Sequence, residues 1–128
     1  MAVPEVRSDD GSSTVMALGL IAALLTMTVA ALVVLGAMRA AHVARSSADL
    51  AALAGAVEYQ RDPASSAACA EVERISRRHD VEMIACDVSA GGVVTVTTAA
   101  PVPLRLAGIG PDQAEGRARA GPEAEGRG

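Results

Sequence analysis

Residues 11–38 read GSSTVMALGLIAALLTMTVAALVVLGAM, a run of 28 residues without a charged side chain. The hydrocarbon core of a bilayer is about 30 Å thick and needs roughly 20 apolar residues of α-helix at 1.5 Å each. A chain of 128 residues has too little remaining sequence to bury such a helix on all sides. The stretch therefore predicts a membrane-spanning helix with the lipid bilayer as its partner, because a single span satisfies its backbone in lipid only as a helix.

The segment that follows the span is amphipathic and contains no helix breaker before Pro63. It reads RAAHVARSSADLAALAGAVEYQRDP from residue 39 to residue 63. Proline disrupts a helix interior, and glycine weakens one by about 1 kcal/mol relative to alanine. We therefore expect one continuous helix over residues 12–60, which crosses the membrane and continues beyond it, with Gly55 as its weak point.

Two sets of residues on this helix suit contact with another helix. The first is a helix-packing seam with heptad spacing, which comprises Gly36, Ala40, Val43, Ser47, Leu50, Ala54 and Val57. The second is a row of small residues at every fourth position, which permits close approach of a crossing partner and comprises Gly36, Ala40, Ala44, Ala48, Ala52 and Ala56. The alternative is an alanine-rich helix that forms through intrinsic propensity alone.

A second helix and a β-hairpin are predicted after Pro63. Residues 64–80, ASSAACAEVERISRRHD, place their aliphatic side chains on one helical face. VEMIACDVS and GGVVTVTTA then read as two strands around the pair Gly91 and Gly92, and the second alternates valine with threonine. The predicted fold class is α+β: a long N-terminal transmembrane helix that continues into an amphipathic helix, followed by a small helix plus β-hairpin module over residues 63–106.

The two ends of the chain carry weaker signals. Residues 1–11 are expected to form a disordered leader, and residues 107–128 to form a loop and then a disordered tail. Small residues alternate with charged ones over residues 114–120, which permits a weak strand. The apolar side chains just before and within this region need cover from protein or from the bilayer surface, and they are Leu104, Leu106 and Ile109.

Composition excludes several classes of function. Tyr59 is the sole aromatic residue and the net charge is −4 without a long basic run, which argues against nucleic-acid binding and an aromatic ligand pocket. The sequence contains no HExxH, CxxC or phosphate-binding glycine loop. The strong metal ligands besides carboxylates are His42, His79, Cys69 and Cys86, and their spacing fits no standard zinc site. We therefore expect no catalytic, cofactor-binding or metal site, no small-molecule substrate and no nucleic-acid partner.

Cys69 and Cys86 are the two cysteines, and both follow the span. An even pair in a small module beyond a membrane indicates one disulfide in an oxidising compartment. The alternative is two unrelated buried thiols. A bridge would connect the second helix to the first strand and would stabilise the module by roughly 3 kcal/mol, a large contribution for so small a unit.

The amino-terminal half of the chain resembles a known family. The residues DDGSSTVMALGL, the apolar run and then RAAHVARSSADLAALAGA are similar to the TadE/TadG-like proteins of tight-adherence (Tad/Flp) pilus systems, in particular a short branch from bacteria with GC-rich genomes. The resemblance implies a pilin-like, membrane-anchored pseudopilin that serves as a structural or assembly component of a pilus or related secretion system, with other pilin-like subunits as partners. The alternative is a single-span accessory protein that holds a small exported module beside a membrane complex without entering a filament.

The resemblance also bears on processing and orientation. Gly11 followed by Ser12 corresponds to the bond that prepilin-type processing cuts, but Met16 stands where the family pattern has a glutamate. Arg39 and Arg45 follow the span against Arg7 before it, which favours a cytoplasmic carboxyl end on the positive-inside rule. The resemblance and the cysteine pair instead imply a single-pass protein of the cell membrane with an extracytoplasmic C-terminal module.

Overall fold

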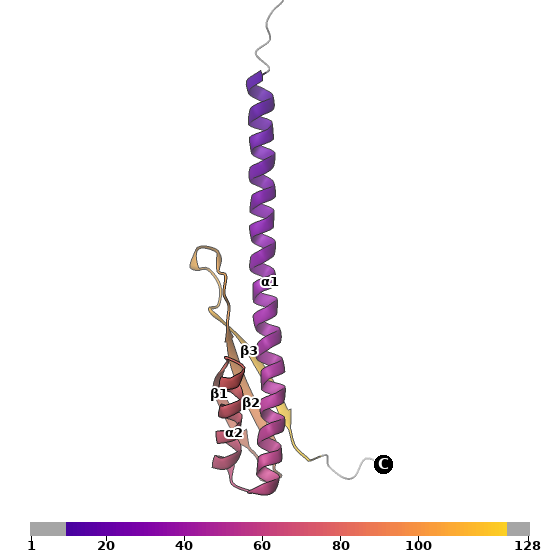
Figure 1. Cartoon of the computed structure of the whole chain (residues 1–128), viewed down its shortest axis with the longest axis vertical. Coiled ribbons are helices and arrows are strands. Elements are labelled where there is room, and N and C mark those ends of the chain that lie inside the picture. Colours follow the sequence, from indigo (N-terminus) through magenta and orange to yellow (C-terminus); the bar gives the residue numbers. More distant parts are fainter. Residues whose placement is uncertain (1–9, 123–128) are drawn as a thin grey trace, which may run out of the picture.

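The computed structural model describes residues 10–122, and its architecture is α+β as predicted. The elements in chain order are α1 (Asp10–Arg61), α2 (Ser65–Arg78), β1 (Glu82–Val88), β2 (Val94–Pro101), the short 3-10 turn η1 (Leu106–Gly108) and β3 (Gln113–Ala120). In Figure 1, α1 runs the length of the molecule and the other elements lie beside its carboxyl-terminal half. Residues 1–9 of the expected leader and residues 123–128 of the expected tail lie outside the described residues, whereas residues 10 and 11 belong to α1.

The amino-terminal half of α1 is long and apolar enough to cross a membrane. Its most apolar 18-residue window has a mean hydropathy of 2.6, and none of that window is buried by the rest of the chain. Two hydroxyls inside the run are satisfied within the helix: Thr26 Oγ1 donates to the carbonyl of Ala22, and Thr28 Oγ1 to that of Leu24, both at 2.8 Å. A helix in lipid needs this internal satisfaction, because the hydrocarbon offers no hydrogen-bond partner.

The sheet has three antiparallel strands in the order β1-β2-β3, where the sequence predicted a hairpin and permitted a weak third strand. β1 and β2 form that hairpin around a turn in which Gly92 has a φ of 78°, with a bulge between Met83 and Ala85. β3 pairs with β2 without interruption from Val94↔Ala120 to Pro101↔Gln113. The third strand is full length because every second residue of β3 is small, which lets α1 lie directly on the sheet.

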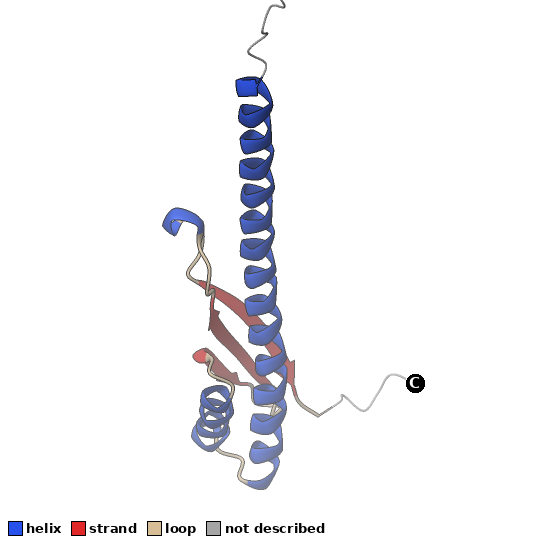
Figure 2. Cartoon of the chain, turned by 45° about the horizontal axis from the view of Figure 1, so that its top comes forward, coloured by secondary structure: helices blue, strands red, loops and turns tan. Residues whose placement is uncertain are grey.

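Both helices cover the same face of the sheet, and the core lies between them and β2 (Figure 2). The core consists of small aliphatic side chains, namely Ala48, Ala51, Ala52, Ala56, Ala68, Val72, Val94, Val96 and Ala118. On β3, Ala118 belongs to this core and Ala114 packs against a second cluster formed by Ala40, Ala44, Val81 and Ala100, while the charged residues of the strand are exposed. The sheet therefore has one covered face and one polar face.

Helix α2 is held in place by its ends and by local polar contacts. At its carboxyl end the amide of Val81 bonds to the carbonyl of Ser76 and that of Asp80 to Arg77, with Asp80 at a φ of 55°. This is the Schellman arrangement, which satisfies the last helical carbonyls and usually places glycine at the left-handed position. Val81 is buried, so the motif also directs the chain into β1.

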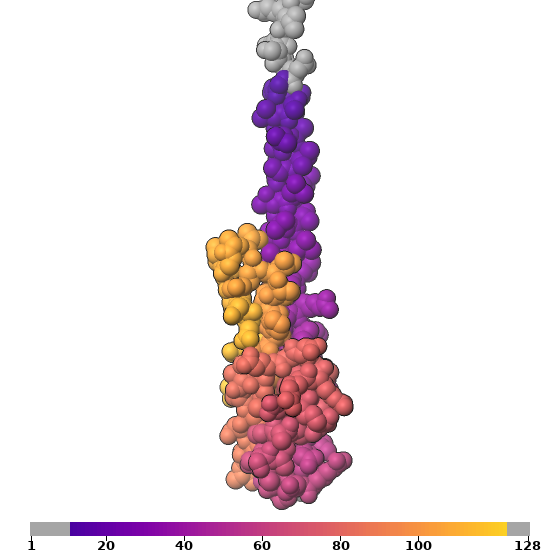
Figure 3. All heavy atoms as spheres, turned by 60° about the vertical axis from the view of Figure 1, so that its left-hand side comes forward, coloured from indigo at the N-terminus to yellow at the C-terminus, as the bar shows by residue number. Residues whose placement is uncertain are grey.

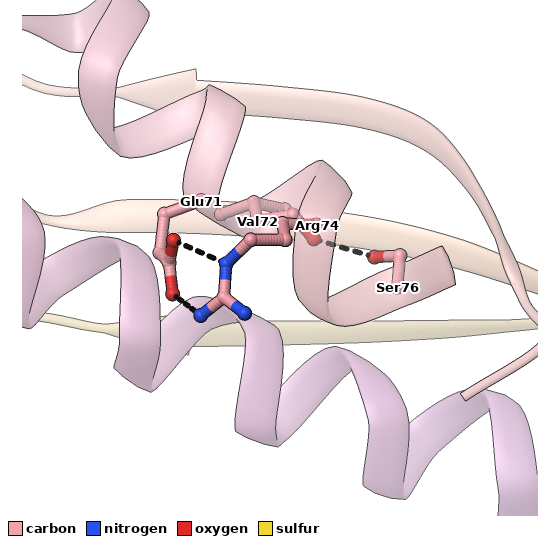
Figure 4. Close-up of polar contacts among 4 residues, drawn as sticks. All are labelled: Glu71, Val72, Arg74 and Ser76. Carbon is pink, nitrogen blue, oxygen red and sulfur yellow. Dashed lines mark hydrogen bonds and ion pairs between the residues drawn. The ribbon is translucent and has the colours of Figure 1, made fainter. Parts of the chain in front are cut away.

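The surface of α2 carries an ion pair between two residues about one helical turn apart (Figure 4). Arg74 donates from Nε to Glu71 Oε2 at 2.9 Å and from Nη2 to Glu71 Oε1. The hydrogen-bonded guanidinium holds the pKa of the Glu71 carboxyl below its ordinary value. Figure 4 also shows the buried Ser76 hydroxyl, which donates to the carbonyl of Val72 at 2.9 Å.

Cys69 and Cys86 form a disulfide that joins α2 to β1, with their Cα atoms 5.9 Å apart and a sequence separation of 17. The predicted bridge between helix and sheet is thus present. The structure gives it a clear role, because α2 contacts the sheet mainly through β1.

Candidate functional site

α1 and β3 approach so closely at Gly116 that no side chain fits between them. A Cβ atom at Gly116 would lie 2.4 Å from Ala44 C and 2.4 Å from Arg45 N. Thr98, opposite Gly116 on β2, donates its buried hydroxyl to the carbonyl of Ala44 at 2.7 Å. We call Ala44, Thr98 and Gly116 the crossing point, because here the helix backbone touches the sheet backbone.

Gly55 is a second position of close packing, where α1 meets α2. A Cβ there would lie 2.7 Å from Val72 Cγ2, 3.2 Å from Val94 Cγ1 and 3.3 Å from the carbonyl oxygen of Ala68. The helix continues unbroken through this residue to Arg61. The glycine that the sequence marks as a weak point is therefore a position where helix propensity is given up for close contact between the helices.

The row of small residues on α1 is covered by this chain's own module. Ala40, Ala44, Ala48, Ala52 and Ala56 are all buried. Small residues allow close approach of a partner element, and here the partner is the sheet and α2 rather than a second molecule. Close helix packing on this face is thus used inside the chain.

The heptad seam is divided by the fold. Ala40 and Ser47 are buried under the sheet. Gly36, Val43 and Ala54 are partly buried, and Gly36 lies beside Pro103, whose Cγ would be 3.8 Å from an added Cβ. Leu50 and Val57 are exposed. The seam therefore runs along one edge of the covered face, and only its last part is open to a partner.

The face of α1 that points away from the sheet carries three exposed aliphatic side chains. Leu50, Leu53 and Val57 are 50%, 56% and 42% exposed. At about 100° per residue, Leu53 lies roughly 180° around the helix from Ala44. We call Leu50, Leu53 and Val57 the outer stripe. The sequence pattern did not identify Leu53, because heptad spacing places the adjacent residue, Ala54, in the seam.

The span is a second exposed apolar surface of α1, separated from the outer stripe by residues 39–49, in which no large aliphatic side chain is exposed. Large aliphatic side chains are exposed all round the amino-terminal half of α1, including Leu18, Leu24, Leu25, Leu32 and Leu35. In Figure 3 this half of the helix stands free above the module. A helix exposed in this way needs lipid or other helices around it.

Residues 11–58 match the family described as "Putative Flp pilus-assembly TadE/G-like". Over this range the chain is TadE/G-like. The match covers nearly all of α1, including the crossing-point residue Ala44 and the outer stripe. The comparison with curated proteins gave no match, and neither did the comparison with solved structures. The matched segment contains the helix that is long and apolar enough to cross a membrane, so the likeness to a pilus-assembly family and the candidate membrane anchor coincide.

The residues of the expected cleavage site lie at the start of this TadE/G-like segment. Gly11 and Ser12 belong to the first turn of α1, which begins at Asp10. Both are exposed, and a Cβ at Gly11 would meet nothing within 4 Å. Met16 is exposed one turn further along. The bond is therefore open to solvent or lipid, and cleavage stays a prediction.

The residues considered for chemistry lie on several elements: His42 on α1, Cys69 on α2, His79 at the end of α2 and Cys86 on β1. Cys86 is bonded to Cys69, so His79 has no thiol to activate. His42 is exposed on the TadE/G-like helix and His79 at the end of α2. Within residues 10–122, no group of three His, Cys, Asp or Glu side chains is arranged to hold a metal ion. A shallow groove near the end of the span is lined by Gly36, Arg39, Ala40, Val43, His79, Asp80, Ala100, Pro101 and Pro103.

Proposed function

We propose that the chain is a membrane-anchored, pseudopilin-like structural or assembly component of a Tad/Flp-type pilus or related secretion system that acts through helix packing. The observation that carries this proposal is that α1, a helix that matches a pilus-assembly family, exposes two apolar surfaces, the span and the outer stripe, on either side of a polar interval over residues 39–49. The module covers one face of the helix and leaves the opposite face free. A long helix with one open apolar face is suited to lateral packing against other helices.

The disulfide supports an extracytoplasmic module, because such bonds persist in oxidising compartments. The arginine count around the span points the other way in the sequence. The difference between the two flanks is a single arginine, Arg39 and Arg45 against Arg7. We give the disulfide more weight than this small charge asymmetry.

The test is site-specific photocrosslinking in the membranes of the native host. A photoreactive residue replaces Leu53 in the outer stripe, Leu24 in the span, or Arg119 on the polar face of the sheet as the control. We expect adducts with a second copy or with another pilin-like subunit from Leu53 and Leu24, and none from Arg119. The same adducts should be present in pilus or secretion complexes purified from these cells.

The outcomes separate the two functional hypotheses. Adducts from Leu24 alone would mean that only the span has a partner, which is the behaviour of a single-span accessory protein outside a filament. If neither Leu24 nor Leu53 gives an adduct, helix packing is not the mode of action. Mass analysis of the purified protein also decides whether the amino terminus is Ser12.

A further inference from the structure

We propose that the loop between β2 and β3, residues 102–112, inserts its apolar tip into the lipid leaflet on the module's side of the membrane. The chain would then hold the bilayer at two points, α1 and this loop, and the module would be fixed against the membrane surface. The inference rests on the membrane-anchoring role of α1 in the proposed function. It adds a lipid contact by a segment outside the TadE/G-like match.

The tip of this loop is apolar and open. Leu104, Leu106 and Ile109 are 50%, 51% and 78% exposed. Figure 3 shows the loop, in orange and gold, extending from the module alongside the span. Within residues 10–122 these three side chains are half exposed or more, so a surrounding medium or a partner must cover them.

The loop lies beside the part of α1 that crosses the membrane. A surface hollow between them is lined by Leu25, Thr26, Val29, Ala30 and Leu106. Closer to the module, Pro103 lies beside Gly36. The loop tip thus reaches back along the span, away from the body of the module (Figure 1).

The depth of the tip follows from the helix rise. Arg39 is the first charged residue after the span and follows Ala30 by nine residues, which corresponds to about 14 Å. The headgroup layer on each side of the hydrocarbon core is about 5–8 Å thick. Leu106 lies beside the helix between Leu25 and Ala30. Its side chain is therefore beyond the headgroup layer and among the acyl chains when Arg39 is at the membrane surface.

Several backbone polar groups of the loop are hydrogen-bonded within the protein. The amide of Ile109 bonds to the carbonyl of Leu106, and the amide of Val102 to that of Asp112, both at 2.9 Å. Arg105 is the only charged residue between 102 and 111, and its guanidinium donates to the carbonyls of Gly108 and Gly110 at 3.4 Å. Because irregular backbone does not lie exposed within the hydrocarbon core, the loop backbone belongs at the boundary between headgroups and acyl chains, with only the aliphatic side chains of the tip inserted further.

Lipid is the occupant that the geometry favours over a neighbouring protein. The tip is level with the chain's own span, where lipid surrounds any part of the helix that does not contact another subunit. Insertion of a few aliphatic side chains to a depth of about 5–10 Å is the usual mode of interfacial anchoring. In water the same three aliphatic side chains would remain exposed to solvent.

The test uses the full chain with its disulfide intact, at one copy per nanodisc of phosphatidylcholine and phosphatidylglycerol. An environment-sensitive fluorophore is attached to a single added cysteine at Ile109→Cys, Val29→Cys or Ala90→Cys. Val29 reports the span, and Ala90 is the matched aqueous control because the β1–β2 turn is at the opposite end of the module (Figure 1). Lipids with a nitroxide on the headgroup or on the acyl chain act as quenchers.

We expect the label at Ile109 to show a blue-shifted emission and quenching by the shallow acyl nitroxide, as at Val29, while the label at Ala90 is unaffected. Quenching at Val29 without quenching at Ile109 would overturn the loop proposal and leave the proposed function standing. A blue shift at Ile109 without lipid quenching would mean that protein covers the tip, which also overturns the proposal. If Val29 is not quenched, α1 is not an anchor, and both the proposed function and this inference fail.

Discussion

Substitution of Gly116 by alanine tests whether α1 and the sheet are in backbone contact. The added Cβ would lie 2.4 Å from Ala44 C and Arg45 N, whereas ordinary contacts begin at 3.4 Å. These are main-chain atoms in the middle of a long helix, so no side chain can rotate away. Strand β3 and helix α1 must therefore separate by about 1 Å at the crossing point.

The separation has two costs. Overpacking of this kind typically destabilises a domain by about 1–3 kcal/mol. The same displacement lengthens the bond from Thr98 to the Ala44 carbonyl, now 2.7 Å, beyond hydrogen-bonding distance, and a buried hydroxyl without a partner costs about 1–3 kcal/mol more. We expect Gly116→Ala to lower the free energy of unfolding of the module by about 2–6 kcal/mol, a large share of what so small a unit possesses.

The measurement is urea unfolding of the full chain in detergent, followed by Tyr59 fluorescence and by hydrogen exchange of the β2 and β3 amides. Tyr59 is a suitable probe because its ring packs against the β1–β2 turn, with ring carbons 3.1 Å from an added Cβ at Gly92. Gly91→Ala is the matched control, since a Cβ at Gly91 meets nothing within 4 Å. Equal unfolding midpoints for the two variants would refute the backbone contact at Gly116.

Three further changes test other parts of the packing. Gly55→Ala should cost less than Gly116→Ala in the same urea assay, because its new Cβ lies 2.7 Å or more from its neighbours rather than 2.4 Å from main-chain atoms, and because alanine adds about 1 kcal/mol of helix propensity. Reduction of the disulfide should lower stability by roughly 3 kcal/mol, seen as a lower urea midpoint with reductant, and a Cys69→Ala, Cys86→Ala double variant should not respond to reductant. The pKa of Glu71 is lowered in the folded protein, so the ion pair stabilises the fold fully above the ordinary glutamate pKa and loses this effect as the pH falls through the pKa of the folded state. Glu71→Gln should therefore remove a small decrease in melting temperature that the parent protein shows at acidic pH.

The parts of the fold that follow from local pattern were predictable from the sequence. The uncharged run and the absence of proline before Pro63 determine a long helix. The valine and threonine alternation after Gly92 determines a strand whose two faces differ. In both cases the decisive interactions are between residues close in the chain, so the sequence shows them directly.

The third strand and the direction of α1 depend on contacts between distant residues. The alternating residues of β3 include Ala114, Gly116 and Ala118, whose small side chains give almost no hydrophobic signal. Their contribution becomes visible only in the folded structure, because their small size is what allows α1 to approach the sheet closely. For the same reason the small row on α1 predicts a partner without saying whether that partner is another molecule or the chain's own sheet.

The assignment of the small row to internal packing determines which surface of α1 is left for function. After the span, α1 has one face of small residues and one aliphatic face. The face of small residues, which includes Ala44, is buried against the module. In the function we propose, the outer stripe is the apolar surface after the span that is left for contact with another subunit, and it points away from the sheet. Because α1 is continuous from the span to Arg61, the stripe keeps a fixed direction relative to the span. A partner that packs along both must then present a helix that is itself long and continuous across the membrane surface.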